Sequence, residues 1–253
     1  GASASTGFPA LFIGTSRAYN NSTSSKVIGN VADYLPLTTL NTLCRNLSAS
    51  YTLTDNAVIN GSTCFTVTAA NVTLDCAGYS IIGNRTMGTA GVYSNQFNTT
   101  VQNCNIVNFS TGIDLRSSSN LVLNNNISTA GMGYTGSYGV YGVLLYGSSN
   151  SRIIGNAVNT SGNSSAWDAA LRIESSSTGN LVENSTFYGE SKALMVFAGS
   201  SNNNFTNISA GSNASTSIQI SHSSGAHNNL KFTGLSTLGS VAGSAVYNAG
   251  GAN

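Results

Sequence analysis

Charged side chains are scarce in this chain. They make up 7% of its 253 residues, whereas an average soluble protein has about 25%. Nine Lys and Arg are balanced by eight Asp and Glu, so the net charge is near +1. Nucleic acids are bound through clusters of basic residues that neutralise phosphates. The sequence has no such cluster and excludes a nucleic-acid partner.

Long apolar runs and metal-ligating patterns are also missing. No run of about 18 apolar residues exists, so the sequence predicts no membrane span. The two histidines, His222 and His227, lie far from the four cysteines, which lack the C-x-x-C spacing of a zinc site. Methionines number only three, which argues against a protein that handles metals. We expect no cofactor.

The carboxylates do not form pairs. A glycoside hydrolase needs two carboxylates at a set separation across the sugar. A polysaccharide lyase needs carboxylates that hold Ca²⁺ and a base that takes the proton. No D-D or D-x-D pair occurs among the eight acidic residues: Asp33, Asp55, Asp75, Asp114, Asp168, Glu174, Glu183 and Glu190. We therefore assign no catalytic residue and expect that the protein is not an enzyme.

A repeating unit of about 20–30 residues fills the sequence instead, a period that signals a stacked solenoid. Each unit consists of a short alternating strand, a Ser/Gly/Asn turn, a second short strand and an Asn-rich turn. Successive units begin at Gly112, Gly142, Ala170, Ala193 and Ser217. The repeat predicts about seven coils over roughly residues 44–247.

Alternating apolar residues place one side of each strand inward, and stacked units bury that side in a continuous column. Asn suits the turns because it tolerates left-handed backbone geometry. A run of antiparallel hairpins is the alternative. Hairpins favour turns such as Asn-Gly, however, and these are nearly absent here apart from Asn60-Gly61. The residues predicted to point inward are Val72, Leu74, Ile113, Leu115, Val143, Leu145, Leu171, Ile173, Leu194, Val196, Ile218 and Ile220.

The unit resembles the right-handed parallel β-helix repeat of pectate-lyase-like proteins and their NosD-like relatives. The likeness is strongest over residues 64–83, where Asn71-Val72-Thr73-Leu74-Asp75 matches the N-V-T-L-D of that family's entry coil. It covers roughly residues 44–235. The chain also resembles sheath and surface-layer proteins of methanogenic archaea. The resemblance implies an all-β, single-stranded right-handed parallel β-helix, and in Asp75 it implies a residue that bonds turn amides.

The repeat divides the chain into an N-terminal arm or cap (1–43), a parallel β-helix (44–235) and a C-terminal strand with a tail (236–253). The arm contains an apolar patch with Phe8, Leu11, Phe12 and Ile13. The patch either caps the exposed end of its own helix or docks on a neighbouring copy. Two insertions, 130–139 and 159–168, lengthen coils and should protrude on one side.

The four cysteines all lie in the first half of the chain. Cys44 and Cys64 are about one coil apart, and so are Cys76 and Cys104. Because a residue one coil later stacks on its predecessor, the spacing predicts these two disulfides, which form in an oxidising compartment. Four buried thiols are the alternative. The chain begins at Gly1 without methionine, as a secreted protein does after removal of its signal peptide.

The sequence contains fifteen Asn-x-Ser/Thr motifs, the acceptor pattern for N-linked glycans. A chain this rich in Asn, Ser and Thr would show about nine by chance, so the motif alone is weak. The glycosylation candidates are Asn20, Asn21, Asn46, Asn60, Asn84, Asn98, Asn159, Asn163 and Asn213.

Two charged pairs occupy equivalent positions with reversed sign, Asp114/Arg116 and Arg172/Glu174. We interpret them as exposed ion pairs or contact residues rather than an active site. Four tyrosines form either a carbohydrate-binding stripe or an aromatic protein interface: Tyr134, Tyr138, Tyr141 and Tyr146.

Scarce charge lowers repulsion between copies of a protein and favours permanent packing. The alternative is that thin β-helices are simply polar and uncharged. Together with the arm and the lack of paired carboxylates, the charge deficit predicts an extracellular structural protein. We expect it to assemble with copies of itself into a sheath, surface layer or filament, with cell-surface glycans as further partners. A carbohydrate-binding or polysaccharide-cleaving surface protein is the alternative.

Overall fold

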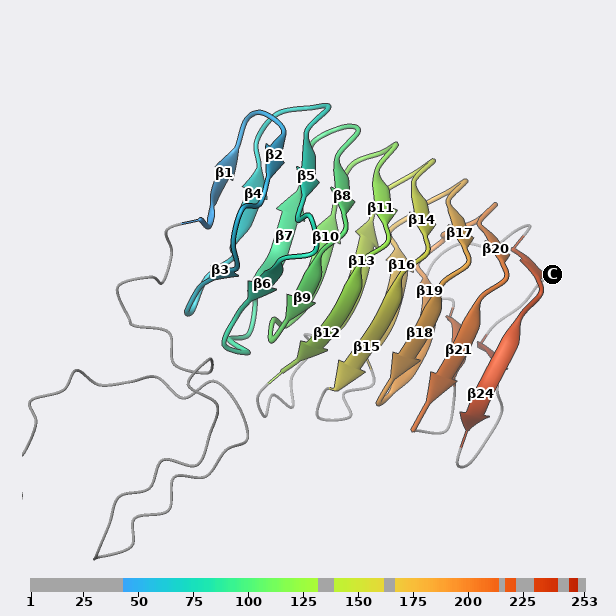
Figure 1. Ribbon diagram of the computed structural model, residues 1–253. Coiled ribbons are helices and arrows are strands. Elements are labelled where there is room, and N and C mark those ends of the chain that lie inside the picture. Colours follow the sequence, from blue (N-terminus) through green and yellow to red (C-terminus); the bar gives the residue numbers. More distant parts are fainter. Residues whose placement is uncertain are drawn as a thin grey trace, which may run out of the picture.

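The structure is a computed structural model that describes residues 43–131, 139–161, 167–213, 217–221, 230–240 and 246–249. Every regular element in these segments is a β-strand. The strands form three sheets, and each strand pairs in parallel with the strand three positions later in the chain. The predicted all-β class and the parallel solenoid are therefore confirmed (Figure 1).

The three sheets, here called A, B and C, run along the whole solenoid. Sheet A contains β1 (Arg45–Leu47), β4 (Phe65–Val67), β7 (Ala90–Ser94), β10 (Thr111–Leu115), β13 (Tyr141–Tyr146), β16 (Ala169–Glu174), β19 (Lys192–Phe197), β22 (Ile218–Ser221) and β25 (Val246–Ala249). Sheet B contains β2 (Tyr51–Thr52), β5 (Thr73–Asp75), β8 (Thr100–Gln102), β11 (Leu121–Leu123), β14 (Arg152–Ile154), β17 (Leu181–Glu183), β20 (Asn204–Thr206) and β23 (Lys231–Thr233). Sheet C contains β3 (Ala57–Val58), β6 (Ser80–Ile82), β9 (Asn105–Val107), β12 (Asn126–Ala130), β15 (Ala157–Ser161), β18 (Thr186–Gly189), β21 (Ser209–Ser212) and β24 (Ser236–Ser240).

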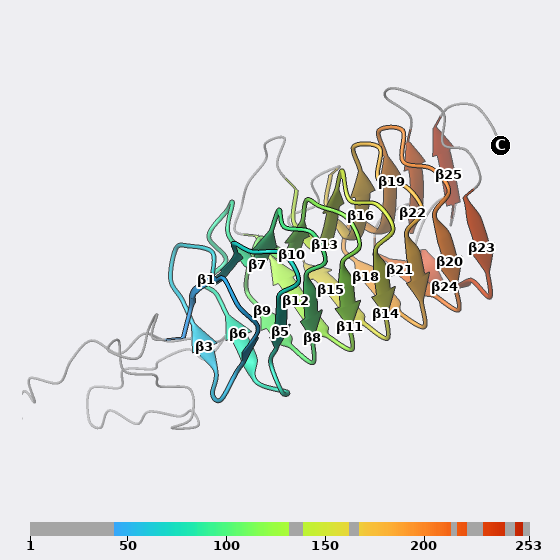
Figure 2. The same ribbon diagram turned by 90° about the horizontal axis from the view of Figure 1, so that it is seen from above.

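One coil of the chain passes through sheets A, B and C in turn and then returns to sheet A. Sheets B and C each have eight strands and sheet A has nine, so the described chain completes eight coils where the repeat predicts about seven. In Figure 2 the strands of sheet A lie along one side of the solenoid and those of sheet B along the other. β24 and β25 lie in the segment expected to hold the C-terminal strand and tail, and they extend sheets C and A.

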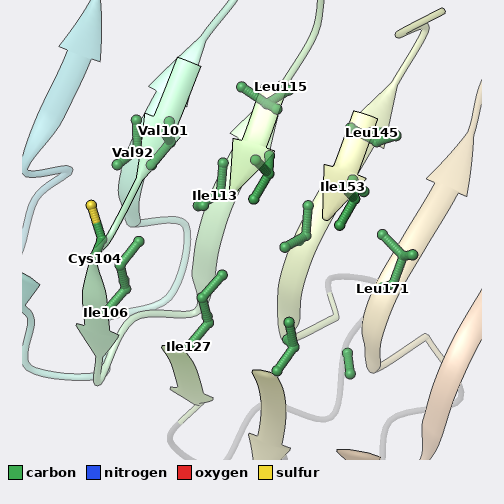
Figure 3. Close-up of a cluster of buried hydrophobic side chains, with 14 of the residues drawn as sticks. Val92, Val101, Cys104, Ile106, Ile113, Leu115, Ile127, Leu145, Ile153 and Leu171 are labelled. Atoms are coloured by element: carbon green, nitrogen blue, oxygen red, sulfur yellow. The ribbon is translucent and has the colours of Figure 1, made fainter. Parts of the chain in front are cut away.

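The interior is a column of aliphatic side chains, because alternate residues of every strand point inward. Val92 and Ile113, for example, come from the neighbouring strands β7 and β10 of sheet A and are fully buried (Figure 3). Of the twelve residues predicted to point inward, eleven are at most 2% exposed. Ile220, near the end of the solenoid, is partly exposed.

Left-handed turn residues stack at two corners of the coil. Between sheets A and B, this position is held by Asn98, Ser119, Asn150, Gly179 and Asn202, and between sheets B and C by Asn103, Asn124, Gly155, Asn184, Asn207 and Gly234. Their φ angles lie between 49° and 68°, a region that Asn and Gly enter at the least steric cost. The repeated Asn therefore marks the corners.

In most coils the residue after the left-handed turn is buried and polar, and these residues form a ladder along the solenoid. At the corner between sheets B and C, Asn156 accepts hydrogen bonds from the backbone and side-chain amides of Asn125 (2.9 and 3.0 Å), and it donates to the carbonyls of Val122 and Ile154. Asn180 and Asn203 repeat this pattern at the corner between sheets A and B. These amides satisfy turn backbone groups that would otherwise be buried without partners.

Both predicted disulfides are present. Cys44 pairs with Cys64 across 20 residues and Cys76 with Cys104 across 28, with Cα atoms 4.5 and 4.7 Å apart. Each bridge joins one coil to the next, as the spacing predicts.

Several expected features lie outside the described residues. These are the arm with Phe8, Leu11, Phe12 and Ile13, the candidates Asn20, Asn21 and Asn163, and Tyr134, Tyr138, His222 and His227. The two insertions lie in the connections from β12 to β13 and from β15 to β16. Both connections join sheet C to sheet A.

Replacing Asn156 with Ala should destabilise the protein by about 2 kcal/mol, because it leaves the Asn125 backbone amide buried without its partner and removes a donor from the carbonyls of Val122 and Ile154. Chemical denaturation measures the change. Asn126→Ala is the matched control: Asn126 is exposed, and its loss should cost under about 0.5 kcal/mol. Equal effects of the two substitutions would show that the buried ladder adds no stability.

Candidate functional site

The outer face of sheet A gathers several aromatic and charged side chains. Its strands β13, β16 and β19, with six residues each, are the longest that the structure describes, and the side chains of this face fall in two outward rows. The register places Tyr93, Asp114, Leu144, Arg172 and Met195 in one row and Arg116, Tyr146, Glu174 and Phe197 in the next. Within this face, two arginines each organise a group of neighbours.

The first group surrounds Arg116. Its guanidinium forms an ion pair with Asp114 on the same strand, with Nη2 2.9 Å from Oδ2 and Nε 3.1 Å from Oδ1. The rings of Tyr93 and Tyr146 lie 5.5 and 5.2 Å from the guanidinium carbon, within cation–π range. Arg116 and Tyr146 are each 44% exposed. This group is therefore open to solvent.

The second group surrounds Arg172. Its Nη2 donates to Glu174 on the same strand and its Nη1 donates to the hydroxyl of Tyr141 at 2.9 Å. Three rings border the guanidinium: Tyr141 at 5.1 Å, Trp167 at 5.2 Å and Phe197 at 5.5 Å. Arg172 is only 6% exposed, so its charge is neutralised within the protein.

The two ion pairs exist as predicted, but the expectation that both are exposed is wrong. Trp167, at the end of the second insertion, packs with Phe197 edge to face over Arg172, with ring centroids 5.5 Å apart. Aromatic cover therefore removes Arg172 and Glu174 from water, whereas Arg116 remains exposed. Equivalent positions in the repeat thus carry pairs with different energetics, because a buried charge depends on its partner far more than an exposed one does.

Five titratable groups of the described residues have shifted pKa values, among them Asp114, Lys192 and Asp75. Burial raises the pKa of Asp114 even though its ion pair with Arg116 opposes the shift. Burial lowers the pKa of Lys192, against the attraction of Asp168. The backbone amide of Ala77 and the side chain of Gln102 donate to Asp75 and lower its pKa. Asp75 thus bonds a turn amide, as its resemblance to the entry coil implies.

Two carboxylates lie on the outer face of sheet A. Asp114 and Glu174 lie two strands apart and one row apart, which places their Cα atoms roughly 12 Å from each other. Each carboxylate is also engaged by its own arginine. In the segments that the structure describes, no cluster of three His, Cys, Asp or Glu side chains could hold a metal ion.

The described glycosylation candidates are all exposed: Asn46, Asn60, Asn84, Asn98, Asn159 and Asn213. Three of them, Asn60, Asn84 and Asn98, belong to surface ladders. The side chain of Asn98 donates to Asn71 at 2.8 Å, and that of Asn84 donates to Asn60. Of the four tyrosines singled out from the sequence, Tyr141 lies in the buried Arg172 group and Tyr146 in the open Arg116 group.

The described part of the chain contains no helix long and apolar enough to cross a membrane.

A family model described as "right handed beta helix region" matches residues 90–253. No curated protein matches the chain. Among solved structures, the chain is similar to the crystal structure of the Dettilon tailspike protein, with 13% identity and a TM-score of 0.41. That match covers 80% of this chain and 60% of the tailspike chain.

Glu174→Gln should destabilise the protein by about 3–5 kcal/mol, because it leaves the guanidinium of Arg172 buried without a counter-charge. The matched change Asp114→Asn should cost under about 1 kcal/mol, because Arg116 remains hydrated. Urea denaturation at neutral pH measures both. Similar losses would show that aromatic cover does not decide the energetics.

The pH dependence provides a second test. A raised folded-state pKa at Asp114 favours its protonated form. The stability of wild type relative to D114N should therefore be greatest below the unfolded pKa of about 3.9 and should fall as pH rises through the folded pKa. A difference that grows with pH would contradict the raised pKa.

Proposed function

Because this chain belongs to the right-handed β-helix family, we propose that it is an extracellular structural protein that packs against copies of itself in a sheath, surface layer or filament. Its partners in this role are copies of the same chain. The fold supplies rigid, flat faces whose side chains recur at fixed spacing, and such faces suit repeated contacts.

One observation carries the proposal: no strand of sheet C contains a charged residue. From β6 to β21 its outward positions hold Asn, Ser, Thr and aliphatic residues together with Tyr188. Some of these side chains already bond along the axis; Asn105 donates to Ser80 at 2.9 Å and Asn126 donates to Asn105 at 3.3 Å. A face of this kind forms hydrogen bonds without electrostatic repulsion between copies.

The proposal includes a non-catalytic role, supported by the engagement of Asp114 and Glu174 with arginines. It also includes secretion with removal of a signal peptide. The two disulfides are consistent with an extracellular location, since such bonds persist in oxidising compartments. Glycans on the exposed sequons belong to the same proposal.

Electron microscopy of the purified protein at neutral pH should show ordered polymers. Ser128→Lys places a charge on the exposed side of β12 in sheet C and should prevent or shorten these polymers, because each contact would bury an unpaired charge. Ala70→Lys, at an exposed turn, adds the same charge outside sheet C and should leave them intact. Monomers of wild type at every concentration would overturn the proposal.

Glycan binding on sheet A is the second candidate. The exposed ring of Tyr146 lies between Arg116 and Glu174 in the same row. An apolar ring face beside hydrogen-bonding groups is the combination that small-molecule sites use. The open Arg116 group therefore supports recognition of a sugar chain.

Calorimetric titration with polygalacturonate tests this candidate. Tyr146→Ala should weaken binding by about tenfold or more, because stacking area is lost. Tyr79→Ala, which removes a tyrosine of similar exposure (38%) away from sheet A, should leave the affinity unchanged. Absence of binding by wild type, or equal losses in both variants, would reject the candidate.

A further inference from the structure

The outer face of sheet B carries an aliphatic stripe. On β11, β14 and β17 the central residues Val122, Ile153 and Val182 are fully buried, so the flanking residues point outward. Leucine and isoleucine occupy outward positions of all three strands and are partly exposed. We call Leu123, Ile154 and Leu181 the sheet B stripe.

The register makes this stripe diagonal. Leu123 pairs with Ile154, and Ile154 pairs with Glu183, in one outward row. Leu181 lies in the other row, where it pairs with Arg152. The stripe therefore crosses from one row to the other between β14 and β17, so that Arg152 lies on one side of it and Glu183 on the other.

Arg152 and Glu183 have opposite charges, yet they do not pair with each other. In the described part of the chain neither residue belongs to an ion pair within 4.0 Å, unlike Arg116 with Asp114 and Arg172 with Glu174. Arg152 is exposed and Glu183 is partly exposed. Each charge is therefore available to a partner molecule.

This pattern is complementary to itself. A two-fold axis that lies in the contact plane along the stripe would place Arg152 of one copy opposite Glu183 of the other, and the reverse. The same axis would lay the aliphatic side chains of the stripe against their own counterparts. Such isologous contacts are the commonest way in which identical chains pair.

We propose that sheet B is a two-fold interface between two copies of this chain, centred on the sheet B stripe. This inference rests on the proposed self-assembly and names one of its contacts. A specific interface needs roughly 1,200–2,000 Å² of buried surface in total, so the contact extends over β8 and β20. The outward residues there are Thr100, Gln102, Asn204 and Thr206, none of which opposes an approaching copy with charge.

The chemistry favours a second copy over an unrelated partner. Any partner would have to present an aliphatic ridge with an acidic group on one side and a basic group on the other, in the spacing that the stripe sets. A second copy of sheet B presents this arrangement by symmetry. A two-fold contact forms only dimers, so the uncharged sheet C supplies the separate contact that extends them into a polymer.

Sedimentation velocity of the full chain over a range of concentrations tests the interface through charge reversal. Arg152→Glu and Glu183→Arg should each weaken dimerisation by about tenfold or more, because each sets like charges against each other twice in a dimer. The double variant R152E/E183R should regain wild-type dimerisation, because the exchanged charges again pair. An equimolar mixture of wild type and double variant should contain homodimers but few heterodimers.

Lys231→Glu is the matched control, because Lys231 is exposed on β23 of the same sheet and lies outside the stripe. It changes the net charge as Arg152→Glu does and should leave dimerisation unchanged. Circular dichroism melting of each variant checks that the solenoid remains folded, and an unfolded single variant is replaced by Leu181→Ser, which should weaken the dimer without charge reversal.

The outcomes separate the two proposals. Wild type that sediments only as a monomer overturns both the sheet B interface and the proposed self-assembly. Wild type that associates, with all charge variants unaffected, overturns the sheet B interface alone. Weakening by both single variants without recovery in the double variant overturns the two-fold pairing.

Discussion

Everything in this protein depends on the in-register parallel pairing of each strand with the strand one coil later. Neighbouring strands in such a sheet lie about 4.8 Å apart, so every coil must advance by the same small step. Identical positions of successive coils therefore lie directly above one another. A residue type that suits a position once suits it in every coil, which is why the turn asparagines, the inward aliphatic residues and the buried amides all form columns.

The repeat was sufficient to predict a solenoid, the inward column and the disulfide pairing, because these follow from spacing. The right-handed parallel β-helix was implied by the resemblance to pectate-lyase-like proteins. Ile113 and Leu115, for example, are buried as the alternation of apolar and polar residues along their strand predicts. The Arg172 group could not be predicted as a buried site. Its cover comes in part from Trp167, which lies in an insertion that breaks the repeat. The other two rings, Tyr141 and Phe197, come from the strands on either side of the Arg172 strand. Contacts across insertions depend on packing that no period encodes.

A signal for the Arg172 group was nevertheless present. Aligning the coils places Tyr146, Glu174 and Phe197 in one outward row of sheet A. An acidic residue between two aromatic residues is unusual in a chain with so little charge. The stripe on sheet B was equally visible as outward aliphatic residues in Leu121-Val122-Leu123 and Arg152-Ile153-Ile154. Recognising both features requires the strand register of sheets A and B, because the side chains that lie next to one another come from different coils.

The placement of the disulfides gives the solenoid a direction. Cys44–Cys64 and Cys76–Cys104 fasten successive coils at the N-terminal end, whereas no cysteine follows Cys104 in the sequence. Coils of a solenoid contact only their neighbours, so coils beyond β9 are retained by non-covalent pairing alone. A chain pulled at both ends would therefore peel from its C-terminal end while the covalently fastened end stayed wound. In a surface exposed to mechanical load, such a molecule yields from one end only and keeps a wound core on which the released coils can rewind.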